Sequence, residues 1–205
     1  MHQPLRDVLP SSRTAMTQAI EEPSYEVVRR IDDVELRQYV AYAVAEVEVA
    51  GPAAGASRDG FRILAGYIFG KNRGNTRLAM TAPVIQQPLL VRPSMTVPVT
   101  SRAVDAGFRV QFVLPGRVSL ATAPVPLDPR IQLRTVPATR IAALRFSGFW
   151  TDSNYRKHLE QLQAILRRAD LAWDGEPIYA RYNAPWTPWF MRRNEIWLRL
   201  GSGAQ

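Results

Sequence analysis

The sequence contains no cysteine, only two lysines and only two histidines among its 205 residues. The absence of cysteine excludes disulfides, thiolate catalysis, cysteine-ligated zinc and iron–sulfur clusters. His2 and His158 do not have the spacing of a paired metal motif, so we expect neither a resident metal nor a zinc enzyme. The sequence also lacks a P-loop and a G-x-S-x-G nucleophile elbow, two common signatures of catalytic sites.

Long apolar segments are absent too. No run approaches the ~18 residues needed to cross a bilayer, and residues 1–22 hold no continuous apolar stretch like that of a signal peptide. We therefore expect residues 1–22 to be a disordered tail, in which Met16 is an alternative to Met1 as the translation start. Residues 23–201 are expected to form a single cytoplasmic domain without a membrane span.

The net charge is +8, and arginine carries nearly all of the positive charge. Guanidinium groups bind carboxylates and phosphates in a planar fork and stack on aromatic rings. The arginines alternate with acids inside apparent strands, as in "YEVVRRIDDVELRQY" from Tyr25 to Tyr39, and no nucleic-acid-binding motif is present. The charge pattern therefore favours solvated strand faces over a nucleic-acid-binding surface.

The first half of the chain predicts strands, then a helix, then strands. Apolar and polar residues alternate over residues 25–49, with a turn at "IDD". Residues 51–70 predict a helix whose apolar stripe is Phe61, Leu64, Ala65 and Ile68, and glycines within it allow close approach to its backbone. Residues 76–87, interrupted at Pro83, and residues 108–115 predict strands that flank a long loop over residues 87–107.

The second half repeats this order. Residues 130–148 predict two strands around a short turn, residues 152–168 a helix, and residues 176–185 and 192–200 two strands. The phrases "TAPV" at residues 81–84 and "NAPW" at residues 183–186 suggest weak internal repetition. Sequential strands with one helix per half predict an α+β protein whose antiparallel sheets curl together, with both helices outside and pockets at the junctions.

The aromatic-rich stretch "YNAPWTPWFMRRNEIW" contains three of the five tryptophans. Pro185 and Pro188 bracket Trp186 and fix the backbone there. A stiff aromatic loop beside Arg192 and Arg193 is typical of a wall for a flat, anionic ligand. The alternative is a proline-rich lid whose tryptophans pack inward.

A second candidate lies on one edge of the first predicted helix. Arg58, Phe61 (or Arg62) and Ala65 lie along this edge beside Gly66, which combines a cation, a ring and small residues. Such an edge is suited to a shallow groove for a flat molecule. In the alternative interpretation, Phe61 and Ala65 face the sheet and Arg58 is solvated.

Three single residues also have a functional and a structural interpretation. His158 is a candidate axial ligand or acid–base group, and Met80 a candidate ligand to haem iron. Glu195 is a candidate interior carboxylate for a cationic ligand. The structural interpretation is favoured for each of them: a helix-border histidine, a core methionine, and an ion pair of Glu195 with Arg192 or Arg193.

Several motifs together resemble the SOUL haem-binding proteins. They are "YEVVRRIDDVELRQY", "GFRILAGYIFGKN", "MTAPV", "FVLP", "RFSGFW" and "YNAPWTPWFMRRNEIWL", in the family's order and covering roughly Tyr25 to Leu200. The resemblance implies a distorted eight-stranded antiparallel β-barrel. Two β-α-β-β-type halves related by a pseudo-twofold axis build this barrel, and two long α-helices flank it.

The resemblance also implies reversible binding of haem and other porphyrins in an apolar groove along the first helix, closed by the loop before the last strand. The implied cofactor-binding residues are Arg58, Phe61, Arg62, Ala65, Gly66, Trp186, Thr187 and Arg192. Some relatives carry a basic residue where Gly66 and Thr187 stand here, and some carry a histidine where Gln38 stands. No axial iron ligand is therefore expected, and Arg58, Arg62 or Arg192 would pair with the propionates.

Three functions remain open at this stage. The first is a soluble haem- or porphyrin-binding protein that acts as a haem buffer or carrier. The second is a small-molecule sensor, since the architecture resembles effector-binding domains in which an interior glutamate, here Glu195, meets lipophilic cations. The third is an enzyme that modifies tetrapyrroles, with His158 or Glu195 as acid–base groups. The sequence leaves the oligomeric state open.

Overall fold

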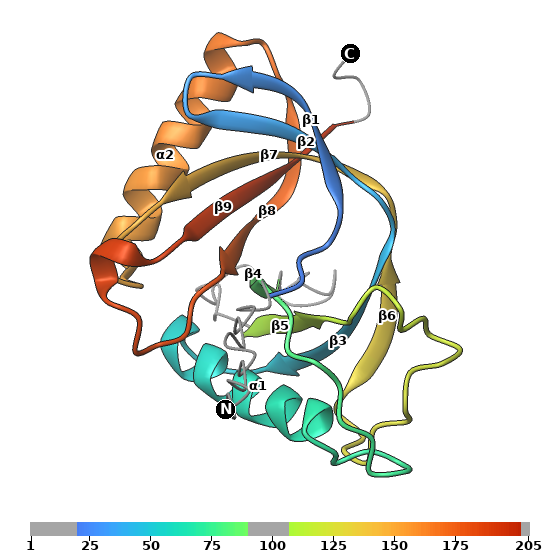
Figure 1. Ribbon diagram of the computed structural model, residues 1–205. Coiled ribbons are helices and arrows are strands. Elements are labelled where there is room, and N and C mark those ends of the chain that lie inside the picture. Colours follow the sequence, from blue (N-terminus) through green and yellow to red (C-terminus); the bar gives the residue numbers. More distant parts are fainter. Residues whose placement is uncertain (1–19, 90–106, 202–205) are drawn as a thin grey trace, which may run out of the picture.

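The computed structural model describes residues 20–89 and 107–201, which form one antiparallel nine-stranded sheet and two α-helices (Figure 1). The strands are β1 (Tyr25–Ile31), β2 (Val34–Tyr39), β3 (Tyr42–Val49), β4 (Val84–Pro88), β5 (Phe108–Val113), β6 (Gln132–Val136), β7 (Thr139–Phe146), β8 (Trp173–Arg181) and β9 (Asn194–Leu200). The helices are α1 (Ala53–Ile68) and α2 (Asp152–Arg168), and a short 3-10 helix, η1, spans Trp189–Met191. The α+β class is confirmed.

Local sequence signals account for both helix positions. Thr151 caps α2, because its side chain accepts a hydrogen bond from the backbone N–H of Asn154. Gly70 follows α1 with a φ of +115°, a left-handed conformation that favours glycine and lets the chain turn sharply after the helix. The expected apolar stripe of α1 is partly wrong: Phe61 is 36% exposed at its edge, whereas Tyr67 is buried.

Two strand boundaries differ from the expectation. Residues 76–83 are not a strand, and β4 begins only at Val84, after the predicted break at Pro83. The phrase "TAPV" therefore precedes or opens β4 while "NAPW" follows β8, so the two phrases do not occupy equivalent positions. Pro137 and Ala138 do not form a hairpin turn, because β6 and β7 pair with β3 and β2 rather than with each other.

The sheet order is β1-β2-β7-β9-β8-β4-β5-β3-β6. Apart from β1, each half runs strand, strand, helix, strand, strand. If β2–β5 are exchanged in order for β6–β9, all strand pairings except that of β1 are reproduced, so the two halves are related by a pseudo-twofold arrangement of their strands. The expected eight strands are nine, because the segment before the "IDD" turn adds β1 to the edge of β2. The order ends at β1 and β6, so a closed barrel is not confirmed.

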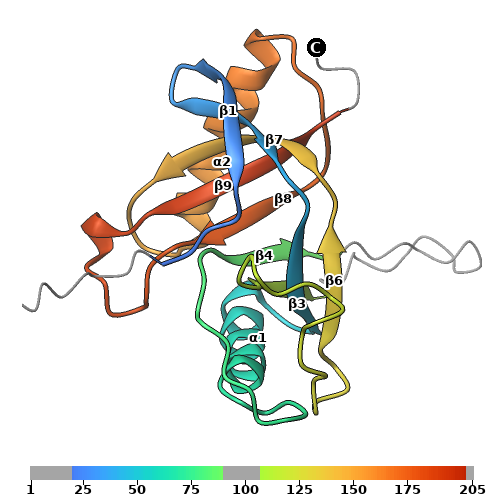
Figure 2. The ribbon, with the colours of Figure 1, turned by 45° about the vertical axis from the view of Figure 1, so that its right-hand side comes forward.

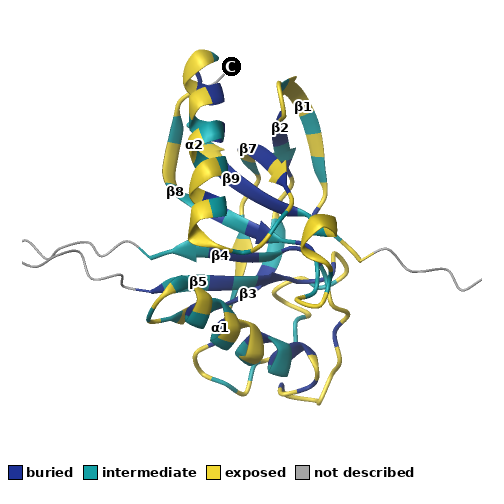
Figure 3. Cartoon of the chain, turned by 90° about the vertical axis from the view of Figure 1, so that its left-hand side faces the viewer, coloured by how far each residue is buried: buried dark blue, intermediate teal, exposed yellow. Residues whose placement is uncertain are grey.

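The helices cover different parts of the sheet (Figures 1 and 2): α2 packs on β7 and β9, and α1 packs on β3 and β5. Figure 3 shows buried positions along β3 and β9 and exposed positions on the outer faces of both helices. Gly60 allows α1 to approach β5 closely, because a Cβ atom there would lie only 2.6 Å from a methyl carbon of Val110. Within residues 20–89 and 107–201, no helix is long and apolar enough to cross a membrane.

Candidate functional site

The segment Tyr182–Arg193, which we call the aromatic loop, connects β8 to β9 and exposes most of its large apolar side chains. Trp186 is 85% exposed and Trp189 is 49% exposed, and Phe190 and Met191 are also exposed. The inward-packed lid is therefore wrong for these side chains. Trp197 is the exception: it lies on β9 and is buried in the core.

Arg192 holds the aromatic loop in shape. Its Nε donates to the carbonyl of Thr187 at 2.8 Å, and its Nη2 donates to the carbonyl of Pro185 at 2.6 Å. The backbone N–H of Gly148 donates to the carbonyl of Trp189, which ties the loop to the segment before α2. These contacts, with two prolines, fix the backbone around Trp186, as the sequence predicts.

A cluster at the base of the loop was not found by sequence reasoning. Arg181, the last residue of β8, donates to the hydroxyl of Ser57 on α1 and, from Nε at 3.0 Å, to the hydroxyl of Tyr155 on α2. Its guanidinium carbon lies 4.9 Å from the centre of the Trp150 ring, and that of Arg192 lies 4.5 Å from the same centre. Arg181 therefore links both helices to the start of the aromatic loop.

The outer face of α1 presents the predicted helix positions to solvent. Arg58 and Arg62 are exposed, and Arg62 pairs with Asp59 of the same helix at 3.4 Å. Phe61 packs edge-on against Phe112 at 5.2 Å between ring centres.

Ala65 and Gly66 are half-buried on the same helix. The side chain of Lys71 lies over Gly66, since a Cβ atom at Gly66 would be 3.1 Å from its Cδ. A cation thus lies beside Gly66, and a single sequence gave no signal for it.

The predicted residues do not form one contiguous contact. No hydrogen bond, ion pair or ring contact within the described residues joins Trp186 or Thr187 to the five predicted positions on α1. Arg181, the residue immediately before the aromatic loop, donates a hydrogen bond to Ser57 on α1.

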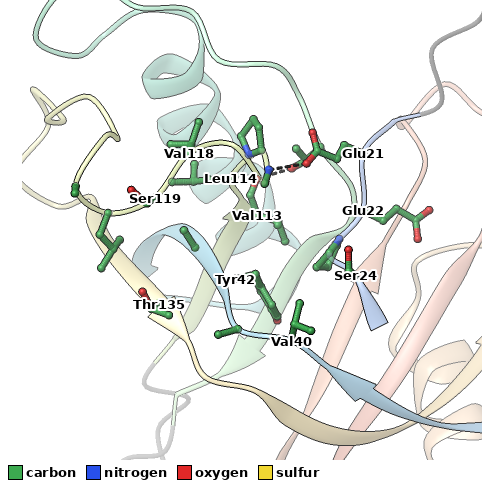
Figure 4. A pocket seen from close by; sticks show the side chains of 18 residues that line it. Glu21, Glu22, Ser24, Val40, Tyr42, Val113, Leu114, Val118, Ser119 and Thr135 are labelled. Atoms are coloured by element: carbon green, nitrogen blue, oxygen red, sulfur yellow. Dashed lines mark hydrogen bonds between the residues drawn. The ribbon is translucent and has the colours of Figure 1, made fainter. Parts of the chain in front are cut away.

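A first cavity, of about 590 Å³, opens between the segment before β1, the junction of β2 and β3, and the turn after β5 (Figure 4). Val40, Tyr42 and Leu114 supply apolar surface, and Glu21 hydrogen-bonds the backbone N–H of Gly116 at 2.5 Å. Lysine and arginine are absent from its lining within the described chain, so no basic side chain there is available to pair with a carboxylate.

A second cavity, of about 710 Å³, is lined by charged residues from β1, β2, β7 and β9 and by Phe190 and Met191 of the aromatic loop. Among the eight predicted site residues, Arg192 alone lines either of these two cavities. Glu195 is among the residues next to this cavity and is fully buried.

The Glu195 carboxylate accepts hydrogen bonds on both oxygens. Arg37 donates to both, at 2.7 and 3.2 Å. Arg193 donates to Oε1 at 2.9 Å, and Trp197 and Tyr182 donate to Oε2 at 2.7 and 3.0 Å. The expected ion pair with Arg193 is confirmed, and Arg37 is a second partner that the sequence analysis missed. Two guanidiniums already balance this charge, so Glu195 is a structural carboxylate rather than an open cation acceptor.

This network shifts the pKa values of its members. Burial alone raises the pKa of Glu195, but the hydrogen bonds and charge of Arg37, together with Arg193, hold it below its ordinary 4.5. Burial raises the pKa of Tyr182 well above its ordinary 10.0, and the neighbouring Glu195 charge raises it further.

Stability is expected to fall at both pH extremes. The lowered pKa of Glu195 stabilises the fold above the ordinary value of 4.5, and this contribution is lost as the pH falls below it. The raised pKa of Tyr182 stabilises the fold below 10.0, and this contribution is lost as the pH rises further. Urea unfolding followed by tryptophan fluorescence across the pH range checks both limbs. An unchanged midpoint on acidification through 4.5 would contradict the first assignment.

The candidate iron ligands have structural environments. His158 stacks on Phe146 with ring centres 4.2 Å apart, and its Nδ1 contacts the carbonyl of Asn154 at 2.7 Å, so it is a helix-border residue. Met80 is exposed rather than part of the core, which corrects its structural interpretation. Within the described part of the chain, no group of three or more acidic or histidine side chains is arranged to hold a metal ion.

Comparison with protein families gives a match over nearly the whole described chain. The family model described as "SOUL heme-binding protein" matches residues 20–199. Heme-binding protein 1 of Xenopus laevis is 27% identical over 165 residues, covering 80% of this chain and 81% of that protein. Heme-binding protein 2 of Homo sapiens is 25% identical over 208 residues, covering 97% and 95%.

Solved structures with the same fold come from proteins of different kinds. The EcmrR C-terminal domain aligns with a TM-score of 0.55 at 12% identity, covering 86% of this chain and 98% of that one. A hydrolase from Listeria innocua aligns with a TM-score of 0.54 at 11% identity, covering 85% and 94%. At this identity the alignments show a shared fold alone.

Proposed function

Because the chain belongs to the SOUL haem-binding protein family, we propose that it is a soluble, cytoplasmic protein that binds haem and other tetrapyrroles reversibly, as a haem buffer or carrier. The observation that carries the proposal is the aromatic loop, a rigid segment that holds Trp186 out in solvent. Large flat side chains are normally buried, and exposed apolar patches mark binding surfaces.

The residues present fit a planar dianion better than a permanently ligated haem. Trp186 and Phe61 offer flat apolar surface, and Arg58, Arg62 and Lys71 offer cations along α1. Face contact with a porphyrin removes several hundred square ångströms from water, at roughly 25 cal/mol per Å² before association costs, which supports roughly micromolar affinity.

The iron has no evident protein ligand. The side chain of Gln38 stands where some relatives carry histidine and donates to a backbone carbonyl, and His158 is held by stacking. Binding therefore rests on the faces and carboxylates of the ring, and metal-free porphyrin should bind as haem does.

The proposal includes the finer architecture of the family. The eight strands β2–β9 form two related halves that curl toward a distorted barrel, with β1 added at the edge of β2. The short β2–β3 and β6–β7 junctions support this arrangement, because β2 pairs with β7 while β3 pairs with both β6 and β5. Residues 23–201 would form this one domain.

Replacing Trp186 with alanine is expected to weaken binding of haemin and of metal-free protoporphyrin at least several-fold, because an exposed aromatic face is lost. Trp186→Phe should retain most of the affinity. His158→Ala is the control and should leave affinity and the Soret band nearly unchanged. Titration followed by porphyrin absorbance and tryptophan quenching measures this. Equal affinities of wild type and Trp186→Ala would contradict the assignment of the loop, and a Soret change lost in His158→Ala would contradict the unligated iron.

A further inference from the structure

Arg181 and Arg192 share one aromatic ring and have no carboxylate partner. Their guanidinium carbons lie 4.9 and 4.5 Å from the centre of the Trp150 ring. Both side chains are only partly exposed, yet neither belongs to an ion pair within the described residues. Two neighbouring cations on one ring repel each other unless an anion lies near them.

Other arginines with low exposure are neutralised. Arg37 pairs with Glu35 and Glu195, and Arg193 pairs with Glu22 and Glu195. The hydrogen bonds of Arg181 go instead to two hydroxyl groups and those of Arg192 to two backbone carbonyls. The Trp150 cluster, by which we mean Arg181, Arg192 and Trp150, thus holds two positive charges with neutral partners only.

Each guanidinium of the cluster keeps a free donor. Arg181 uses Nε and Nη1, which leaves Nη2, and Arg192 uses Nε and Nη2, which leaves Nη1. Neither free nitrogen is among the buried polar atoms without a partner, so both reach solvent. The fixed hydrogen bonds hold the two forks in place, and fixed donors bind an anion with little further loss of side-chain entropy.

The position of the cluster relates it to the ligand surface. Arg181 immediately precedes the aromatic loop and contacts Ser57 in the second turn of α1. The N-cap of α1 is Pro52, which makes no side-chain capping bond, so the positive end of this helix adds to the local potential.

We propose that the Trp150 cluster binds carboxylates of the tetrapyrrole, with Arg181 as a principal partner that sequence patterns do not reveal. The inference rests on the proposed function. It also changes the role of Arg192, which both braces the aromatic loop and offers its free Nη1 to the ligand. An esterified ring, which keeps the aromatic faces but carries no negative charge, loses this contribution.

The experiment compares protoporphyrin IX with its dimethyl ester in wild type, Arg181→Gln and Arg181→Lys, by porphyrin absorbance in detergent-free buffer. Arg181→Gln should weaken binding of the diacid about tenfold and leave the diester unchanged, because a charge-assisted hydrogen bond is lost. Arg181→Lys keeps the charge but not the planar guanidinium. Its affinity for the diacid should lie between those of wild type and Arg181→Gln. Arg117→Gln, at an exposed turn with the same change of charge, is the matched control and should bind the diacid like wild type.

The outcomes separate this inference from the proposed function. If wild type and Arg181→Gln bind the diacid equally, the carboxylate site is overturned while porphyrin binding stands. If wild type binds neither porphyrin, the proposed function fails and this inference fails with it. If Arg181→Gln weakens both porphyrins alike, Arg181 is a positioning residue for the loop, and the carboxylate site is again overturned. Arg192→Gln provides a second test: it should weaken both porphyrins, because the loop loses its brace, and the diacid more than the diester. An equal loss for both would overturn the contact of Arg192 with a carboxylate.

Discussion

Glu195→Gln is expected to lower the free energy of unfolding by about 3–5 kcal/mol, the typical cost of breaking a buried ion pair from one side. Glu195 is 0% exposed and Arg37 is 3% exposed, so water cannot solvate the Arg37 guanidinium once the carboxylate charge is lost. Glutamine has nearly the same shape, but its amide nitrogen would face Arg37 in either orientation. At the Oε1 position it would also face the donor of Arg193, and at the Oε2 position the donors of Tyr182 and Trp197. Urea unfolding followed by tryptophan fluorescence measures the change.

Two further variants identify the cause. Glu48→Gln removes an exposed carboxylate that pairs with Arg109 and should cost less than about 1 kcal/mol. Arg37→Gln combined with Glu195→Gln should cost less than the sum of the two single changes, because the double variant leaves no unpaired charge between these two positions. A loss below 1 kcal/mol in Glu195→Gln, or strict additivity in the double variant, would show that the network is not the buried ion pair described above.

The same network bears on the sensor hypothesis. A cationic ligand at Glu195 would have to displace Arg37 or Arg193, and each has a hydrogen-bonded, partly or fully buried guanidinium. Nothing in the described contacts favours that exchange, although the EcmrR C-terminal domain shares the fold. The geometry therefore favours a ligand outside the core, on the aromatic loop and α1.

Much of the fold follows from local patterns in the sequence. Alternation predicted strands where β1, β2 and β3 lie, and the helix predicted over residues 152–168 is α2 with its observed bounds. The pattern failed where strands change partners. At the β2–β3 and β6–β7 junctions the chain bends without forming a hairpin. The alternation of residues along a strand does not indicate which other strand pairs with it.

The candidate site was harder to predict than the fold. The flanking prolines predicted the stiff backbone around Trp186, but the sequence left open whether its ring packs inward, and only the structure shows it exposed. Arg181 and Trp150 were not predicted, because a single sequence does not show which of many arginines lack a carboxylate once the chain has folded. Lys71 was missed for a related reason: it lies five residues beyond Gly66 and returns over it only because the chain reverses at Gly70.

Gly60→Ala is expected to destabilise the protein by about 1–3 kcal/mol or more, although alanine is the better helix former. The added Cβ would lie 2.6 Å from Cγ2 and 2.7 Å from Cβ of Val110, which is fully buried on β5. Because α1 and β5 are both parts of regular elements, the overlap is relieved only by moving the helix. Thermal and urea unfolding report the loss directly.

Gly55→Ala in the same helix is the matched control, because a Cβ there meets no atom within 4 Å. It should raise the free energy of unfolding by about 0.5–1 kcal/mol, through the lower entropy of the unfolded chain. Gly60→Ala combined with Val110→Ala should cost less than the sum of the two single changes, because the contact with Cγ2 at 2.6 Å is removed while the contact with Cβ at 2.7 Å remains. Equal effects of the two glycine substitutions would contradict close packing at Gly60. A shift of α1 should also weaken diacid porphyrin binding, because Ser57 on this helix helps to hold Arg181 in place.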